Sequence, residues 1–175
     1  MSLLLTHGYY LSDDPKEQKI MKPYPPLGLL YISGYLNSKG IDHHVFDSTF
    51  YSKTKQLDFI REKQPKIVAI YTNLMTKIEV VKLMKTLKTD AYNRPKIILG
   101  GPDVSYNLDN YLNAGADFLI IGEGEETTFE LYQAIVDKSD FSTVNGIAYL
   151  ENGAVFKTAA RTKFRELDQL PLPNR

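Results

Sequence analysis

Ile97-Ile-Leu-Gly-Gly-Pro-Asp103 is the stretch that decides the fold class of this 175-residue chain. An apolar, β-branched run ends abruptly at two glycines and a proline, as buried strands do when they deliver the chain to a crowded surface. Asp117-Phe-Leu-Ile-Ile-Gly-Glu-Gly124 repeats the pattern, and a third apolar run ends at Tyr71 to Leu74. We therefore expect these three strand ends to form one edge of a ligand-binding crevice.

Strands and helices are expected to alternate on both sides of this stretch. Hydrophobic periodicity indicates the elements, and prolines and glycines mark their ends. We expect strands over residues 3–6, 41–47, 66–71, 96–99 and 117–121. We expect helices over residues 27–38, 53–63, 76–88, 108–114 and 125–138. This alternation of strands and helices predicts an α/β fold. We expect a three-layer doubly wound sandwich with a five-stranded parallel sheet in the flavodoxin-like order 2-1-3-4-5. In that order a ligand binds at the carboxyl ends of strands one and three.

The pattern changes after residue 140. Two strand-like runs flank Asn152-Gly153, which is a strong type I′ hairpin signal. We expect three parts: a Rossmann-like domain over residues 1–140, a β-hairpin extension over 141–160 at the sheet edge or toward a following domain, and a linker over 161–175. The long segment from His7 to Pro26 is expected to be either a functional loop or disordered, because of its length and its prolines.

The composition narrows the function classes. Lysine plus arginine equals aspartate plus glutamate at 21 each, so charge gives no reason to expect nucleic acid or an anionic membrane as a partner. No apolar run approaches the roughly 18 residues that span a bilayer, and no signal-peptide pattern opens the chain, so we expect a cytoplasmic location. The chain has no cysteine, which excludes thiolate metal sites, iron–sulfur ligation and cysteine nucleophiles within it.

Motifs for hydrolysis or nucleoside triphosphate chemistry are absent from the sequence, and we predict no catalytic residue and no metal ligand. His7 stands at a predicted strand end, without a paired base or a metal ligand at a recognisable spacing. His43 and His44 are expected to be packing or surface residues.

Gly122-Glu-Gly-Glu-Glu-Thr127 resembles a phosphate-binding loop, but Thr127 stands where the last glycine of that motif belongs. Its three glutamates suit the positive end of a helix dipole and would repel a pyrophosphate. A glycine turn with acidic helix capping explains the acids. A backbone contact from Gly122 and Gly124 to a neutral or amide-rich ligand is the alternative.

Thr72-Asn73-Leu74-Met75-Thr76 follows the third predicted strand and allows two interpretations. The first is a plain strand-to-helix turn in which Thr76 is the N-cap of the helix. The second is part of a ligand site, because hydroxyl and amide side chains at a switch point suit a ligand that presents amides.

Three stretches in this order resemble the N-terminal cobalamin-binding domain of cobalamin-dependent radical S-adenosylmethionine (SAM) enzymes: Pro25-Pro-Leu-Gly-Leu-Leu-Tyr-Ile-Ser-Gly-Tyr-Leu36, Leu99-Gly-Gly-Pro102 and Gly122-Glu-Gly-Glu-Glu-Thr127. The hairpin Val144-Asn-Gly-Ile-Ala-Tyr149 and the exit Leu167-Asp-Gln-Leu-Pro-Leu-Pro173 add to the likeness. That family includes methyltransferases and enzymes similar to the anaerobic magnesium-protoporphyrin monomethyl ester oxidative cyclase. The resemblance implies cobalamin as the cofactor and a C-terminal radical SAM domain in cis, which would hold SAM and a 4Fe–4S cluster. The chain would then be a fragment that is not catalytic alone.

The resemblance also implies which residues hold the corrinoid cofactor. The flat nucleotide tail of cobalamin would enter a slot floored by Gly100 and Gly101, so a leucine at Gly101 is expected to block the slot. Thr72 and Leu74 would line the opposite side, similar to the S-x-L element of cobalamin domains.

The propionamides of the corrin ring would meet amide and carboxylate partners at Asn73, Asp103 and Glu123. Tyr9 and Tyr10 would lie near the corrin if the first loop folds over it. The complete set of predicted cofactor-binding residues is Tyr9, Tyr10, Leu27, Gly28, Thr72, Asn73, Leu74, Thr76, Gly100, Gly101, Pro102, Asp103, Gly122, Glu123 and Gly124.

Two departures from the family pattern keep alternatives open. The D-x-H-x-x-G motif that supplies a histidine to cobalt in domains of the methionine synthase type is absent between His7 and Pro26, which suggests a cobalt without a histidine from this loop. Asp103 stands where members often have histidine. A degenerate, non-binding domain with a structural or substrate-recognition role is therefore one alternative. A flavodoxin-like binder of flavin or another nucleotide is the other, although Glu123, Glu125 and Glu126 argue against it.

Overall fold

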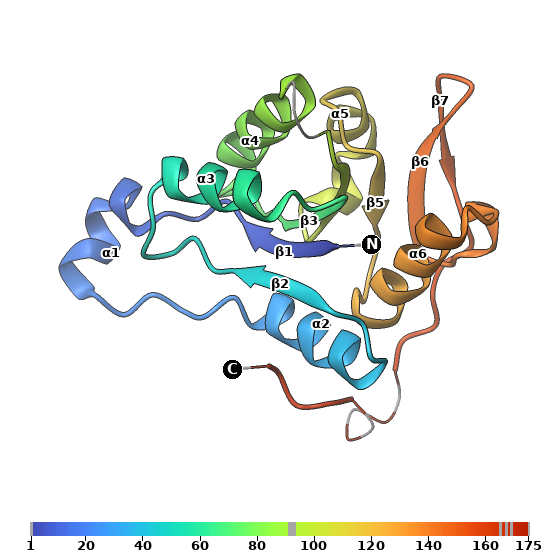
Figure 1. Cartoon of the computed structure of the whole chain (residues 1–175), viewed down its shortest axis with the longest axis horizontal. Helices are drawn as coiled ribbons and strands as arrows, with labels where there is room; N and C mark the ends of the chain where they lie inside the picture. Colours follow the sequence, from blue (N-terminus) through green and yellow to red (C-terminus); the bar gives the residue numbers. More distant parts are fainter. Residues whose placement is uncertain (1, 91–93, 165, 167, 169, 175) are drawn as a thin grey trace.

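A computed structural model of the chain has a seven-stranded mixed sheet between two layers of helices (Figure 1). The structure describes residues 2–90, 94–164, 166, 168 and 170–174. The strand order is β2-β1-β3-β4-β5-β6-β7, and the first five strands are parallel in the predicted order 2-1-3-4-5. These five are β1 (Leu3–His7), β2 (His43–Phe46), β3 (Ile67–Tyr71), β4 (Lys96–Gly100) and β5 (Phe118–Ile120).

The C-terminal hairpin extends the sheet. Strand β6 (Ile147–Glu151) pairs antiparallel with β5, and β7 (Ala154–Lys157) forms the new edge. The expectation of a five-stranded sheet is therefore corrected to seven strands, because β6 pairs with the backbone edge that the short strand β5 would otherwise expose. Asn152 and Gly153 form the predicted two-residue turn, with φ angles of 50° and 81° that fit type I′.

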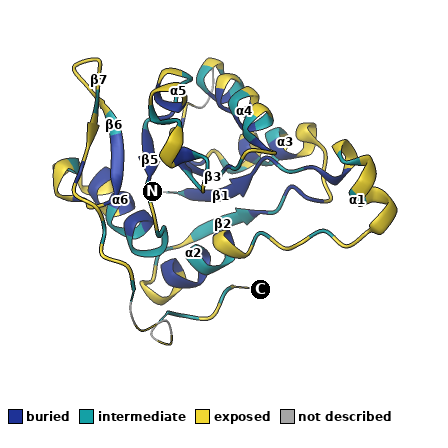
Figure 2. Cartoon of the chain, turned by 180° about the vertical axis from the view of Figure 1, so that it is seen from behind, coloured by how far each residue is buried: buried dark blue, intermediate teal, exposed yellow. Residues whose placement is uncertain are grey.

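Helices cover both faces of the sheet (Figure 1). One face carries α2 (Leu27–Ser38) and α6 (Glu125–Asp137), and the other carries α3 (Lys53–Lys63), α4 (Lys77–Thr89) and α5 (Leu108–Asn113). The central strands are buried on both faces, which explains their continuous apolar sequences (Figure 2). Single 3₁₀ turns occur at Leu11–Asp13, Val104–Tyr106 and Phe141–Thr143. In the described part of the chain, no helix is both long and apolar enough to cross a membrane.

The segment between His7 and Pro26 contains a short helix, α1 (Pro15–Ile20), that the sequence interpretation missed. Asp14 caps it, because its Oδ1 accepts hydrogen bonds of 3.2 and 3.0 Å from the backbone N–H groups of Lys16 and Glu17. Aspartate followed by proline at the first helical position is a helix-start signal that the sequence did contain. No residue of α1 is buried, and the helix projects from the body of the fold (Figure 2).

Thr76 occupies the N-cap position of α4, as predicted, but the side chain that accepts the hydrogen bonds of the turn after β3 is that of Asn73. The Oδ1 atom of Asn73 accepts hydrogen bonds from the N–H groups of Met75 (3.0 Å) and Thr76 (3.1 Å). Thr76 makes no side-chain capping bond, and its Oγ1 instead accepts from the N–H of Asn73 at 3.1 Å. The predicted N-cap position is therefore confirmed, but the Thr76 backbone is helical (φ −100°, ψ −10°) and not extended as is usual for a capping residue, which fits the missing side-chain bond.

Candidate cofactor site

Two adjoining cavities open where β1 and β3 end. The outer cavity, of about 520 Å³, lies between the segment that precedes α2 and the turn that follows β3. The slot, of about 240 Å³, lies between the sheet and helices α2 and α6. Gly28, Leu29 and Tyr71 line both. Because the strand order reverses between β1 and β3, this is the switch point at which doubly wound sheets bind ligands.

The outer cavity combines flat apolar surfaces with short polar groups. Tyr9, Tyr24 and the prolines before α2 supply the flat surfaces, and Asp14 and Asn73 are among the polar residues. The hydroxyl of Tyr9 donates to Oδ2 of Asp14 at 3.3 Å, and burial together with the Asp14 carboxylate raises the pKa of Tyr9, so the phenol stays neutral. Such a lining suits a large ligand with a flat body and an amide-rich edge.

The slot is apolar along its floor. Leu5, Ala69, Ile98 and Ile120 come from four neighbouring strands, and they point toward the α2–α6 face because side chains along a strand alternate between faces. Two apolar residues of α2 close the opposite wall. A flat, mostly apolar group fits a slot of this kind.

Gly28 and Gly100 leave space in the cavities that the fold itself does not need. A Cβ atom added at Gly28 would have no atom within 4 Å, and one added at Gly100 would lie 3.8 Å from the Cβ of Ile120, an ordinary contact. Neither glycine has a positive φ. Because neither sterics nor backbone conformation requires glycine here, the free volume points to a ligand that approaches the backbone closely.

Gly101 is a glycine for a different reason. Its φ is +127°, and an added Cβ would lie 2.0 Å from the carbonyl oxygen of Thr72. The packing of β4 against β3 therefore requires glycine at this position, even though Gly101 also lines the slot. A leucine at Gly101, which the sequence interpretation offered as a way to block the slot, would act on the fold first and so cannot isolate the slot.

The structure brings ten of the fifteen predicted residues to the cavities. The outer cavity is lined by Tyr9, Leu27, Gly28, Asn73 and Thr76. The slot is lined by Gly28, Gly100, Gly101, Gly122, Glu123 and Gly124. The residues that lie outside both linings are Tyr10, Thr72, Leu74, Pro102 and Asp103. The assignment of the fifteen as cofactor contacts remains a prediction, which the position of the first ten supports.

Asp103 contacts α5 and lies outside both cavities. Its Oδ2 accepts a hydrogen bond of 2.6 Å from the hydroxyl of Tyr111 and one of 3.2 Å from Nδ2 of Asn107. Burial and the bond to Asp103 raise the pKa of Tyr111 to about 12, so the phenol stays protonated and keeps donating. Aspartate at this position therefore serves the packing of α5, and its departure from the family pattern does not alter the cavity lining.

Thr72 and Leu74 do not line the slot as the S-x-L comparison predicted. Thr72 is fully buried, with its Oγ1 3.5 Å from the hydroxyl of Tyr111, and Leu74 is 67% exposed. Their neighbours Tyr71 and Asn73 line the outer cavity instead. Successive side chains at a strand end point to opposite faces of the sheet. Of two neighbouring residues, one therefore faces the cavity and the other faces the layer that contains α5.

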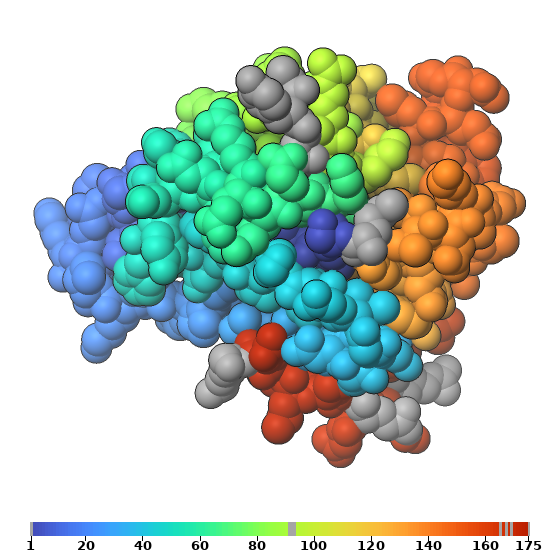
Figure 3. Space-filling model, in the orientation of Figure 1, coloured from blue at the N-terminus to red at the C-terminus, as the bar shows by residue number. Residues whose placement is uncertain are grey.

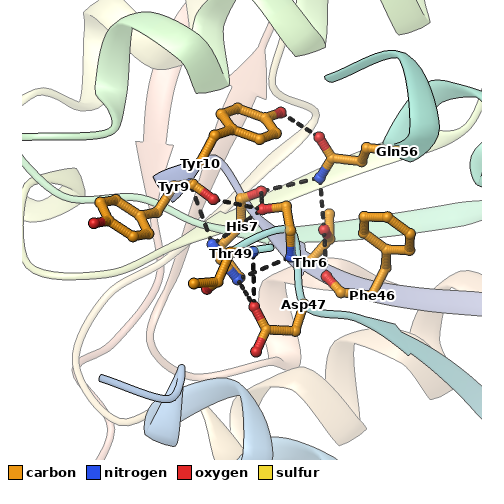
Figure 4. A network of polar contacts seen from close by, with 9 residues as sticks. Thr6, His7, Tyr9, Tyr10, Phe46, Asp47, Thr49 and Gln56 are labelled. Carbon is orange, nitrogen blue, oxygen red and sulfur yellow. Dashed lines mark hydrogen bonds and ion pairs between the residues drawn. The ribbon is translucent and has the colours of Figure 1, made fainter. Parts of the chain in front are cut away.

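Tyr10 points into the protein and helps to hold the end of β1. It is 4% exposed, burial raises its pKa to about 12, and its hydroxyl donates to Oε1 of Gln56. The amide of Gln56 in turn donates to Oγ1 of Thr6 at 2.7 Å and to the carbonyl oxygen of His7 at 2.9 Å (Figure 4). This network holds the backbone at the end of β1, beside the outer cavity.

His7 has a carboxylate partner that sequence spacing could not reveal. Its Nε2 lies 2.9 Å from Oδ1 of Asp47, and its Nδ1 accepts the N–H of Tyr9 at 3.2 Å (Figure 4). We assign a proton to Nε2, because the Asp47 carboxylate can only accept; the backbone N–H of Ser48 also lies 3.2 Å from Nε2. The sequence offered no paired base for His7 at a recognisable spacing, and the register Thr6↔Phe46 supplies one by placing residues 7 and 47 side by side.

Asp47→Asn is expected to lower the free energy of unfolding by about 1 kcal/mol at neutral pH. Burial raises the pKa of Asp47, but hydrogen bonds from His7 and Thr49 outweigh it and lower the pKa from 3.8 to about 2. A carboxyl whose pKa is depressed by folding stabilises the protein above pH ~4, and this contribution is lost as pH falls toward 2. The side chain is 41% exposed, so solvent screening reduces the effect.

Urea unfolding at pH 7, 4 and 2.5 measures the gap between Asp47→Asn and the parent, which should close at the lowest pH. Asp58→Asn, at an exposed position on α3, is the matched control. A gap that stays constant across this range would show that the charge of Asp47 makes no such contribution.

Arg161 anchors the chain that leaves the hairpin. Its side chain is 7% exposed, and its guanidinium pairs with Glu126 at 2.5 Å and with Glu130. Three residues on, the N–H of Phe164 donates to Oε2 of Glu123 at 2.9 Å. The helix start beside the slot is therefore tied to the exit segment, which no local sequence signal indicated.

The exit segment continues along α2 (Figure 3). The N–H of Asn174 donates to the carbonyl oxygen of Leu30 at 3.0 Å. A Cβ at Gly34 would lie 2.3 Å from the carbonyl oxygen of Leu172, so the glycine permits this close contact. Residues 165, 167, 169 and 175 of the predicted linker lie outside the described residues.

The domain is a doubly wound α/β fold with a large cavity and an adjoining apolar slot at its switch point. This arrangement suits a class of protein that binds a bulky cofactor with a flat side group. The chain belongs to the B12-binding domain family, whose model matches residues 18–131. This match confirms the family resemblance predicted from the sequence, and it gives cobalamin as the cofactor class.

Curated relatives carry the same domain within longer proteins. The chain is 28% identical to an uncharacterized methyltransferase of Pyrococcus horikoshii, over 86% of this chain and 33% of that protein. It is 27% identical to the anaerobic magnesium-protoporphyrin IX monomethyl ester cyclase of Cereibacter sphaeroides, over 97% of this chain and 28% of that protein. The chain thus spans about a third or less of these relatives.

Solved structures share the fold. The cobalamin-dependent SAM radical enzyme OxsB with aqua-cobalamin bound matches with a TM-score of 0.77 and 18% identity, over 93% of this chain and 22% of that chain. The radical SAM methyltransferase TsrM of Kitasatospora setae, with cobalamin and an iron–sulfur cluster bound, matches with a TM-score of 0.74 and 17% identity, over 98% of this chain and 31% of that chain. At these identities the likeness establishes the architecture.

Proposed function

We propose that this domain binds cobalamin with the corrin over the outer cavity and the nucleotide tail in the slot. The observation that carries the proposal is the free volume at Gly28 and Gly100, where an added Cβ would meet no nearby atom or make only one ordinary contact. The polar edge at Asp14 and Asn73 offers acceptors and an amide to the propionamides of the ring. Glu123 and Glu125 beside the slot disfavour a pyrophosphate, and hence a flavin dinucleotide.

The proposal includes a cobalt without a histidine ligand from this chain. Both ring nitrogens of His7 have partners within the protein, as does each ring nitrogen of His43. His44 packs edge-on against Phe59 of α3, in the layer opposite the slot. A bound cobalamin supplies the redox and alkyl-transfer chemistry of cobalt, and the residues of this domain bind and orient it.

Hydroxocobalamin in its base-off form is the test ligand. Protein mixed with it should keep its visible absorbance through gel filtration at a ratio of one cofactor per chain. Complete loss of colour at saturating cofactor would overturn the proposal and favour the degenerate alternative. Flavin mononucleotide serves as the matched control, and micromolar quenching of its fluorescence would favour the flavodoxin-like alternative.

The second part of the proposal concerns the parent protein. We infer that the domain (residues 1–140, with the hairpin at 141–160) presents the corrinoid to a radical SAM domain in cis, reached through the segment 161–175. The greater length of the relatives, and the likeness to part of a longer radical SAM methyltransferase with an iron–sulfur cluster bound, support it. SAM and the 4Fe–4S cluster would then belong to that domain. The coding sequence beyond residue 175 tests this, because the proposal requires a C-x-x-x-C-x-x-C motif there.

A further inference from the structure

Thr128 carries a buried hydroxyl with no hydrogen-bond partner. It is 1% exposed, lies in the second turn of α6 and lines the slot. Among the described residues, its Oγ1 is the one buried side-chain nitrogen or oxygen atom left unpaired. Native proteins rarely keep such an atom, because a buried hydroxyl loses its bonds to water without replacement. An unpaired hydroxyl on a cavity wall therefore points to a partner supplied from within the cavity.

The adjacent threonine shows that the helix itself does not cause this. Thr127 uses the usual helical solution, donating to the carbonyl oxygen four residues back, that of Glu123, at 3.1 Å. Its Oγ1 also accepts a bond of 2.6 Å from Nε of Arg161. Thr128 has the same option toward Gly124 and does not take it, so its hydroxyl stays unpaired in a residue that lines the slot.

The surroundings make Thr128 the buried polar contact of the slot. The floor strands and α2 contribute apolar side chains there. Of the two glutamates that border the slot, Glu123 is engaged by the N–H of Phe164, and Glu125 is partly exposed to solvent. A Cβ at Gly124 would lie 2.9 Å from Cδ1 of Ile32 and 3.9 Å from Oγ1 of Thr128, so the glycine lets the Ile32 side chain of α2 pack beside this hydroxyl at the slot wall.

We propose that Thr128 determines which lower base the domain accepts, by hydrogen bonding to a ring nitrogen of that base inside the slot. The inference rests on the proposed function, namely that the slot holds the nucleotide tail of a corrinoid. The ligand class is then a cobamide whose lower base is a nitrogen heterocycle. A cobamide with a phenolic lower base places only carbon at the same depth and would leave the hydroxyl unpaired.

Thr128→Val tests the proposal because it keeps the shape and removes the hydroxyl. We expect its affinity for hydroxocobalamin to fall about tenfold, which corresponds to ~1.4 kcal/mol. Affinity for cobinamide, which lacks the nucleotide tail, and for a phenolic cobamide should stay within about twofold of the parent. Thr128→Ser, which keeps the hydroxyl, is the matched control and should retain the preference for hydroxocobalamin. The midpoint of thermal unfolding of the cofactor-free Thr128→Val variant should be equal to or above that of the parent, because an unpaired polar atom has been removed.

These readouts separate a ligand contact from a structural role, since a structural role would lower stability and affinity together. Equal affinity of Thr128→Val and the parent for hydroxocobalamin would overturn the proposal, as would equal loss for the phenolic cobamide. The parent supplies a measurement that needs no variant: it should prefer hydroxocobalamin over the phenolic cobamide by about tenfold, and equal affinities would overturn the proposal. In each of these outcomes the parent still binds corrinoids, so the proposed function stands although the role of Thr128 is lost. A parent that binds no corrinoid would overturn both the proposed function and the role of Thr128.

Discussion

Gly28→Leu is expected to abolish cobalamin retention, with an affinity at least about a hundredfold below that of the parent (~2.7 kcal/mol). Gly28 lines both cavities, so a leucine there would fill the passage through which the corrin and its tail must connect. An added Cβ at this position has no atom of the surrounding protein within 4 Å, so we expect the new side chain to extend into the cavities and displace ligand. Titration of the visible absorbance with hydroxocobalamin measures the loss.

The same helix offers a matched control. Asn37 is exposed near the end of α2, so Asn37→Leu adds the same side chain outside both cavities and should bind cobalamin like the parent. Thermal unfolding of cofactor-free Gly28→Leu should occur at or above the temperature of the parent, because leucine is favoured over glycine in a helix by about 0.5–1 kcal/mol. A folded Gly28→Leu variant with parental affinity would show that the cofactor does not pass this junction.

Gly101→Ala is expected to lower the free energy of unfolding by about 3 kcal/mol or more, whereas Gly100→Ala should lower it by less than about 1 kcal/mol. The two glycines are adjacent but differ in what surrounds them. A Cβ at Gly101 would lie 2.0 Å from a backbone oxygen of Thr72 and would also require a φ of +127°. A Cβ at Gly100 would make only an ordinary contact, at 3.8 Å. Urea unfolding of the cofactor-free variants measures both values.

The pair also decides how binding data should be interpreted. Loss of cobalamin in a Gly101 variant would report on the β3–β4 packing, while loss in a folded Gly100 variant with a larger side chain would report on the slot. Similar stabilities for Gly101→Ala and Gly100→Ala would contradict this account. In that case the backbone of Thr72 must be able to move away from residue 101 with little change in free energy.

Local signals were sufficient for much of the fold. Helices α2 and α3 begin and end at the predicted residues, 27–38 and 53–63, because prolines, glycines and apolar spacing mark helix ends within a few positions. The order of the first five strands followed from the alternation of strands and helices and from the fixed hand of their crossovers. Helix α1 was missed although Asp14 and Pro15 mark its start, since it buries no residue and so lacks an apolar stripe.

Contacts between distant residues were not accessible in this way. The pair of His7 and Asp47 depends on the register of β1 with β2, and the anchoring of Arg161 on α6 depends on where the hairpin leaves the sheet. The docking of β6 on β5 likewise depends on an edge that only the assembled sheet presents. Each of these requires the relative placement of segments that are far apart in the sequence.

The amino-acid sequence was enough to establish a doubly wound domain of the cobalamin-binding type and to place glycine-rich strand ends at its crevice. Hydrophobic periodicity, the prolines and glycines at element ends and the order of motifs can all be recognised from residues that are close together in the sequence. The assembled fold decided which side chains enter the cavities. It placed Tyr71 and Asn73 there in preference to Thr72, and it turned Asp103 toward Tyr111. It also distinguished Gly28, which leaves room for a ligand, from Gly101, which avoids the backbone of Thr72. The direction of a side chain at a strand end and the space around a glycine are set by elements distant in the chain, so they exist only after packing.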